Sequence, residues 1–224
     1  MKTEVRKIQD LNCIVVFPDA YEKRKKYPTI LFLHGAGSRG NDLEKFKNNP
    51  YFQITAQQKE FPFVTIAPQC ARNTWFDCFE ALEALVDEIS AYDFVDAARM
   101  YLMGASMGGY AVWQLAMSMP DRFAAAVPIC GGGMYWNAAR LVNLPVWAFH
   151  GALDTCVFVE ESEKMVNAVN KRGGCAKLTV YPNNRHDAWS DTYSNPKVFE
   201  WLLAQTNENK KELSDEYKGS NQYG

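Results

Sequence analysis

Short apolar segments recur along the chain between amphipathic ones, and this alternation is what most restricts the fold. Six runs lack the polar alternation of a half-exposed strand: residues 30–34, 63–68, 100–104, 124–129, 146–150 and 177–181. Apolar runs of this length are typical of strands buried on both faces, as in parallel sheets covered by helices. The sequence therefore predicts an α/β protein with a mainly parallel central sheet and helices on both faces.

Helical spacing and sequence length indicate a single domain. Apolar positions recur at helical intervals in residues 79–89, 107–119 and 161–171, and a last helix is expected to begin at Pro196. A further strand, NCIVVFP, is expected near a sheet edge. After Ala204 the sequence becomes polar. We therefore expect one domain over residues 1–204 and a polar C-terminal tail over 205–224.

Composition excludes several classes of protein. The formal net charge is −2, which gives no reason to expect nucleic acid or an anionic membrane as partner. No apolar run approaches the roughly 20 residues that span a bilayer, and the N-terminal MKTEVRKIQD lacks the apolar core of a secretion signal. We therefore expect a cytoplasmic protein. Six cysteines without a CxxC pair, and three histidines, predict free thiols and no metal site.

The strongest local signal is Gly-Ala-Ser-Met-Gly at residues 104–108. It follows a predicted strand directly and opens a predicted helix, which is the setting of a nucleophile elbow. Glycines at both ends remove side chains where strand and helix crowd together. The alternative is a tight turn with an incidental serine. The strand–turn–helix context favours Ser106 as a nucleophile.

A serine hydroxyl needs a base, and the chain has three histidines. His34 and His150 each end a predicted strand and are interpreted as structural residues that fix the following loops. His186 lies on a loop after the last predicted strand. In the nucleophile-elbow fold the triad follows the order serine, acid, histidine, and only His186 leaves room for an acid on a loop after a strand.

The acid is expected at the carboxyl edge of the sheet, where α/β sites assemble. Asp154 lies four residues past the end of a predicted strand and fits this place. Asp121 is at a helix end, where solvation or capping is the simpler role. Asp187 adjoins His186, and neighbouring side chains rarely face each other. Asp154 is therefore predicted to orient the imidazole and stabilise the imidazolium.

The glycine-bearing loop after the strand at 30–34 is the expected second half of an oxyanion hole. We predict that the N–H groups of Ala36 and Met107 form it. The loop also contains G-x-G-x-x-G at residues 35–40, which matches a dinucleotide-binding fingerprint. That fingerprint requires a helix to begin there, and NDLEKFKNNP has too small an apolar face before Pro50 to pack well on a sheet.

Four side chains on loops near these residues are candidates for substrate binding: Gln69, Trp75, Trp136 and Trp189. Aromatic side chains at such places are equally often part of the local core. No long insertion separates the late strands. The sequence therefore predicts no large lid, and small or accessible esters as substrates.

Together, LFLHGAGSRG, FPFVTIAPQC, YLMGASMGGYAVWQLA, AVPICGGG, LPVWAFHGALD and LTVYPNNRHDAW resemble the small α/β-hydrolase carboxylesterases related to dienelactone hydrolase and polyhydroxybutyrate depolymerase. The resemblance extends over residues 27–203, and Ala105 departs from the bulkier residue that usually precedes the serine. It implies an α/β-hydrolase fold and hydrolysis of carboxylic esters without metal or organic cofactor. It also implies a triad of Ser106, Asp154 and His186, and acetyl or feruloyl esters of sugars as a substrate class.

Two alternatives to an esterase remain open from the sequence. A peptidase would use the same triad, with protonation of the leaving amine in suitable geometry. A non-catalytic binding module of the same fold would retain the pocket. A module of that kind would be free to lose Ser106 or His186. Oligomeric state and the acyl and alcohol groups of the substrate are not predicted.

Overall fold

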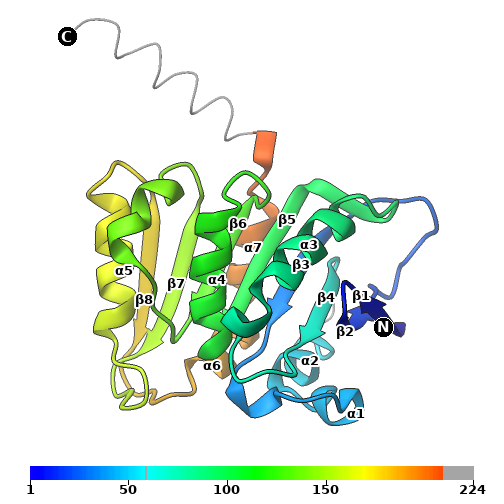
Figure 1. Cartoon of the computed structure of the whole chain (residues 1–224), viewed down its shortest axis with the longest axis horizontal. Helices are drawn as coiled ribbons and strands as arrows, with labels where there is room; N and C mark the ends of the chain where they lie inside the picture. Colours follow the sequence, from blue (N-terminus) through cyan, green and yellow to red (C-terminus); the bar gives the residue numbers. More distant parts are fainter. Residues whose placement is uncertain (59, 209–224) are drawn as a thin grey trace, which may run out of the picture.

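One eight-stranded sheet organises the computed structural model, which describes residues 1–58 and 60–208 (Figure 1). The strands are β1 (Thr3–Ile8), β2 (Leu11–Val16), β3 (Tyr27–Leu33), β4 (Val64–Gln69), β5 (Val95–Ala105), β6 (Ala125–Ile129), β7 (Val146–Gly151) and β8 (Ala176–Tyr181). Their order across the sheet is β1-β2-β4-β3-β5-β6-β7-β8. The β1–β2 and β2–β4 pairs are antiparallel, and the other pairs are parallel.

Helices cover both faces of the sheet, as predicted (Figure 1). One face carries α3 (Phe79–Ser90), α4 (Met107–Ser118) and α5 (Glu160–Asn170). The other carries α1 (Leu43–Phe46), α2 (Pro50–Thr55), α6 (Ala188–Ser194) and α7 (Pro196–Leu203). Three short 3₁₀ helices, η1 (Ala36–Ser38), η2 (Trp75–Cys78) and η3 (Tyr135–Leu141), lie in the connecting loops. The fold class predicted from the apolar runs is confirmed.

Burial follows the pattern of the sequence. Every residue of β3 and β4 is buried, because helices cover both sides of these central strands. In β1, by contrast, exposed and partly buried residues alternate, with Glu4 and Arg6 paired on the surface. The strand was not predicted because its charged, half-exposed sequence differs from the continuous apolar runs. It covers the outer edge of β2 as an antiparallel ribbon.

The connections after β3, β5, β7 and β8 leave the parallel strands at the same edge of the sheet. Sites of α/β proteins form at this carboxyl edge. Within the described residues, no insertion between the strands is large enough to form a large lid, and none of the helices has the length and apolar character needed to cross a membrane. Most of the predicted polar tail, residues 209–224, lies outside the described part of the chain.

Candidate active site

Ser106 occupies a strained turn between β5 and α4. Its φ and ψ are 56° and −119°, a conformation that costs a non-glycine residue about 1–3 kcal/mol. The Ser106 N–H donates to the carbonyl of Ile129 at 2.8 Å. A Cβ added to Gly108 would lie 1.9 Å from the carbonyl oxygen of Leu33, and one added to Gly104 would lie 2.7 Å from the same oxygen. The turn can therefore pack against β3 only with glycine at both places.

The structure brings the three predicted triad residues into one chain of hydrogen bonds. Nδ1 of His186 lies 2.6 Å from Oδ2 of Asp154, and Nε2 lies 2.8 Å from Oγ of Ser106. An ionised carboxylate only accepts, so the proton is on Nδ1 and Nε2 accepts from the Ser106 hydroxyl. This is the tautomer that a general base for Ser106 requires.

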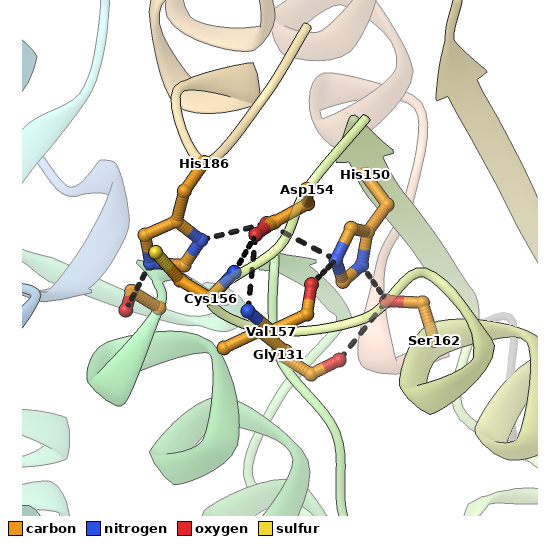
Figure 2. A network of polar contacts seen from close by, with 8 residues as sticks. Gly131, His150, Asp154, Cys156, Val157, Ser162 and His186 are labelled. Carbon is orange, nitrogen blue, oxygen red and sulfur yellow. Dashed lines mark hydrogen bonds and ion pairs between the residues drawn. The ribbon is translucent and has the colours of Figure 1, made fainter. Parts of the chain in front are cut away.

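Asp154 is buried and remains ionised. Burial of the carboxyl group opposes ionisation, but hydrogen bonds from His186 and from the N–H groups of Val157 and Cys156 outweigh it and hold the pKa of Asp154 below its usual value. The two backbone N–H groups donate to Oδ1 at 3.0 and 2.9 Å (Figure 2). Oδ2 is thereby turned toward His186. The carboxylate is fixed in the state and direction that orient the imidazole.

A cavity of about 300 Å³ opens beside Ser106. Its walls come from the loop at residues 35–38, from β3, from the start of α2 and from α6. They include the side chains of Phe32, Asn49, Pro50, Trp189 and Tyr193. Most of the wall is apolar, and Asn49 donates to Oγ of Ser38 at 2.9 Å. The Trp189 ring meets the His186 ring edge-on, with centroids 5.3 Å apart. The hydroxyl of Ser106 therefore faces a small, largely apolar space.

The two N–H groups predicted for an oxyanion hole lie at the first residues of helices. Ala36 begins η1 and lines the cavity, and Met107 begins α4 directly after Ser106. The first N–H groups of a helix have no acceptor within that helix. A Cβ added to Gly35 would lie 3.5 Å from Cβ of Ser106, so the loop that carries Ala36 is packed against the serine. Both residues lie beside Ser106.

Only one of the four predicted binding side chains, Trp189, lines the cavity. Gln69 is buried and donates to the carbonyls of Ser38 and Asp42 at 3.0 and 3.3 Å. Trp75 is fully buried, and its indole N–H donates to the carbonyl of His34 at 3.0 Å. Both hold the loop that follows β3.

Trp136 lies on η3 with 64% of its surface exposed and is not part of the cavity wall. Sequence reasoning missed Phe32, Asn49, Pro50 and Tyr193, which are far from Ser106 in the chain. Asn49 and Pro50 did carry a signal. Asn49 is the N-cap of α2 and Pro50 its first residue, which is the usual start of a helix.

The glycine-rich loop at residues 35–40 does not open a long helix. It contains η1, and the next helix, α1, has four residues. A dinucleotide fingerprint needs a helix whose N-terminus faces the pyrophosphate. The geometry instead places this loop against Ser106 and does not support the dinucleotide alternative.

Cys130, His150 and Asp154 form the one group of metal-ligand types found within residues 1–58 and 60–208, with donor atoms within 4.8 Å of one another. Burial raises the pKa of the Cys130 thiol to about 12, so it carries a proton rather than a free thiolate. The nitrogens of His150 and the oxygens of Asp154 are engaged in hydrogen bonds. This arrangement does not fit an open metal site.

His34 fixes the loop that follows β3. Its Nδ1–H donates to the carbonyl of Gly35 at 2.7 Å, and its Nε2 accepts the N–H of Cys70 at 2.9 Å. A proton on Nε2 would face that N–H and remove the second bond. Burial lowers the pKa of His34 to about 4. The histidine is therefore neutral in the folded protein.

We expect His34 to make stability fall in mild acid. Its folded pKa lies below the unfolded one, so the unfolded chain takes up the proton first. The contribution of His34 to the free energy of unfolding is complete above the unfolded pKa of about 6.5 and is lost as the pH falls to about 4. Roughly 2 kcal/mol of this free energy is lost between pH 7 and pH 5. Urea unfolding at both pH values should show this loss in the wild type and not in His34→Asn. Equal losses in the two proteins would contradict the assignment.

Comparisons with known proteins agree with this fold. The model of the "Dienelactone hydrolase family" matches residues 5–214. Dipeptidyl-peptidase 5 of Porphyromonas gingivalis is 24% identical over an alignment that covers 77% of this chain and 32% of that protein. A bifunctional acetylxylan esterase/xylanase of Neocallimastix patriciarum is 22% identical, over 71% of this chain and 24% of that protein.

Among solved structures, a thermostable esterase superposes with a TM-score of 0.72 at 30% identity, covering 92% of this chain and 63% of that one. The chain thus spans about a third of the dipeptidyl-peptidase and a quarter of the bifunctional enzyme that it matches. The family match, in contrast, extends over nearly all of the chain. This protein belongs to the dienelactone hydrolase family.

Proposed function

We propose that this protein is a serine hydrolase that cleaves small or accessible carboxylic esters through an acyl-enzyme. The observation that carries the proposal is the hydrogen-bonded chain from Asp154 through His186 to Ser106, which ends at a small apolar cavity. The similarity to an acetylxylan esterase and to a thermostable esterase supports an ester as the substrate. Acetyl and feruloyl esters of sugars are the proposed natural class.

In the acylation step, Oγ of Ser106 attacks the ester carbonyl carbon while its proton passes to Nε2 of His186, 2.8 Å away. The carbonyl π electrons move to oxygen, and the resulting oxyanion accepts hydrogen bonds from the N–H groups of Ala36 and Met107. One such donor is worth about 2.7–4 kcal/mol in the transition state. Asp154 stabilises the imidazolium without taking its proton.

The tetrahedral intermediate then collapses. The bond to the alcohol oxygen breaks, His186 gives that oxygen its proton, and the alcohol leaves. In deacylation, a water molecule loses a proton to His186 and attacks the acyl carbon. The second intermediate releases the acid and returns the proton to Oγ of Ser106. No cofactor takes part in these steps.

The cavity limits the acyl group. Each methylene that enters an apolar wall contributes about 0.8 kcal/mol, close to a fourfold gain in kcat/KM. A chain longer than a cavity of about 300 Å³ extends into water and gains nothing further. We therefore expect kcat/KM for p-nitrophenyl esters to rise from acetate to butyrate and to rise no further with longer acyl chains such as palmitate.

A peptidase is the second candidate, favoured by the similarity to dipeptidyl-peptidase 5. The same triad serves an amide if the leaving nitrogen is protonated in suitable geometry. The two are separated by comparing p-nitrophenyl acetate with p-nitroacetanilide and a dipeptidyl p-nitroanilide on one preparation. We expect rapid hydrolysis of the ester alone.

Preferential cleavage of the dipeptidyl anilide would replace the esterase proposal with a peptidase. A folded protein that hydrolyses none of the substrates and does not react with a fluorophosphonate would indicate a binding module instead. Strong activation by emulsified long-chain triglyceride would contradict the small-ester preference.

A further inference from the structure

A second imidazole lies against Asp154, on the side away from His186 (Figure 2). His150 comes from β7 and is fully buried, with Nε2 at 3.4 Å from Oδ2 of Asp154. The same oxygen accepts Nδ1–H of His186 at 2.6 Å. One carboxylate oxygen thus stands between two imidazole rings.

The protonation of His150 toward Asp154 follows from its neighbours. Nε2 lies 2.9 Å from the carbonyl oxygen of Val157 as well as 3.4 Å from Oδ2 of Asp154. Both oxygens can only accept, since the carboxylate is ionised. Nε2 therefore carries a proton, which it donates to the carbonyl of Val157 and which lies close to Oδ2 of Asp154.

The far side of the ring is anchored to other elements. Nδ1 of His150 lies 2.8 Å from Oγ of Ser162 on α5, and that hydroxyl lies 2.9 Å from the carbonyl oxygen of Gly131, after β6. Ser162 has one hydroxyl hydrogen: directed at Nδ1, it is accepted by that nitrogen; directed at the carbonyl, it leaves Nδ1–H to donate to Oγ. In both arrangements Nε2 still faces two acceptor oxygens. His150 links the ends of β6 and β7 to α5, and its buried Nε2 lies 3.4 Å from Oδ2 of Asp154.

We propose that His150 is a positioning residue, and that its Nε2–H holds Oδ2 of Asp154 in line with His186 and disperses the negative charge on that oxygen. This inference rests on the proposed serine mechanism. When Ser106 attacks, His186 becomes an imidazolium and Asp154 must stay ionised. A second N–H dipole 3.4 Å from the same oxygen reduces the affinity of that oxygen for a proton and keeps the proton on His186. His150 touches no substrate, because it does not line the cavity.

Other ionisable groups face this region. Burial raises the pKa of Cys130 to about 12 and also raises the pKa of Tyr110 above its usual value, so neither loses a proton between pH 5 and 8. The acidic side chains nearby are Glu161, which interacts with Tyr110, and Asp187, which interacts with Cys130. The test variants leave these groups unchanged.

Glutamine and methionine have nearly the same shape. Substituting each of them for His150 therefore separates the effect of the N–H donor from the effect of side-chain volume. His150→Gln keeps an N–H donor at a similar reach, whereas His150→Met removes it. We expect His150→Met to lower kcat by between about 10- and 100-fold with little change in KM, because Asp154 loses its alignment. The acid limb of the pH profile of kcat/KM should shift by about 0.5 pH units toward higher pH. Without the nearby N–H, the negative charge on Asp154 is less dispersed and favours the imidazolium form of His186.

His150→Gln should recover most of kcat and return the acid limb to its wild-type position. Ser162→Ala, which removes the anchor and keeps the Nε2–H, should leave the limb in place. A His150→Met protein with reduced kcat but an unmoved limb would show a purely structural role and overturn the proposal. So would a Gln variant no better than Met.

A measurement on the unaltered protein keeps the proposal testable if a variant fails to fold. The chain contains three histidines, so ¹⁵N spectra of histidine-labelled protein resolve six ring nitrogens. We expect Nε2 of His150 to show the shift of a protonated nitrogen throughout pH 5–8. An unprotonated Nε2 would overturn the proposal even in an active enzyme. Absence of ester hydrolysis by the wild type would instead refute the proposed function, and the spectra would still report on the His150–Asp154 contact.

Discussion

Ser106→Ala is expected to lower kcat/KM for p-nitrophenyl acetate by at least about 10⁴-fold and to leave the protein folded. The substitution removes Oγ of Ser106, the atom that attacks the ester, and leaves Nε2 of His186 without its hydrogen-bond partner. Alanine keeps the Cβ and the φ of 56°, so the turn retains its shape and strain. The measurement is steady-state hydrolysis by the two proteins, with folding followed by circular dichroism and urea unfolding.

Two controls make this result decisive. A fluorophosphonate should label the wild type at Ser106, as located by peptide mass spectrometry, and should not label the variant. Ser106→Gly should be equally inactive and at least as stable as Ser106→Ala, because glycine carries no Cβ strain at this φ. Equal hydrolysis by a folded Ser106→Ala protein would remove Ser106 as the nucleophile.

Gly108→Ala is expected to destabilise the fold by at least about 4 kcal/mol or to prevent folding altogether. The new Cβ would lie 1.9 Å from the carbonyl oxygen of Leu33 and 2.9 Å from that of His34, both backbone atoms at the end of β3. No rotamer relieves this overlap, so α4 must move away from the sheet. Urea unfolding gives the stability, and hydrolysis of an ester gives the accompanying loss of activity.

Gly37→Ala is the matched stability control in the neighbouring loop. A Cβ added there meets nothing within 4 Å, so its free energy of unfolding should differ from wild type by no more than about 0.5 kcal/mol. Its activity is not part of the comparison, because Gly37 lines the cavity. A Gly108→Ala protein as stable as Gly37→Ala would show that the elbow tolerates a side chain at residue 108.

The buried strands were predictable because burial on both faces leaves continuous apolar runs in the sequence. β3 and β4 are examples, with every residue buried. The edge strand β1 was missed, since one half-exposed face gives it a charged, alternating sequence. α2 was missed for another reason. Pro50 was interpreted as an interruption, although a proline that follows an asparagine N-cap begins a helix.

The positions of Ser106, Asp154 and His186 were predictable because each follows a strand at the same edge of a parallel sheet, in a fixed chain order. The cavity wall was not. Its side chains come from segments that no local pattern links, such as Asn49 and Tyr193. Which way a loop side chain turns depends on packing, and Trp75 turns into the core to hold the loop after β3.

The chemical centre is assembled from distant parts of the chain. Ser106 and His186 are 80 residues apart, and His186 follows β8, which pairs with β7 alone among the described strands. Closing so long a loop costs entropy that is recovered only when the last strand docks. The base is therefore in place only when β8 has docked on β7 and brought the loop with His186 beside Ser106. A chain in which β8 is not docked would carry Ser106 without the imidazole that activates it.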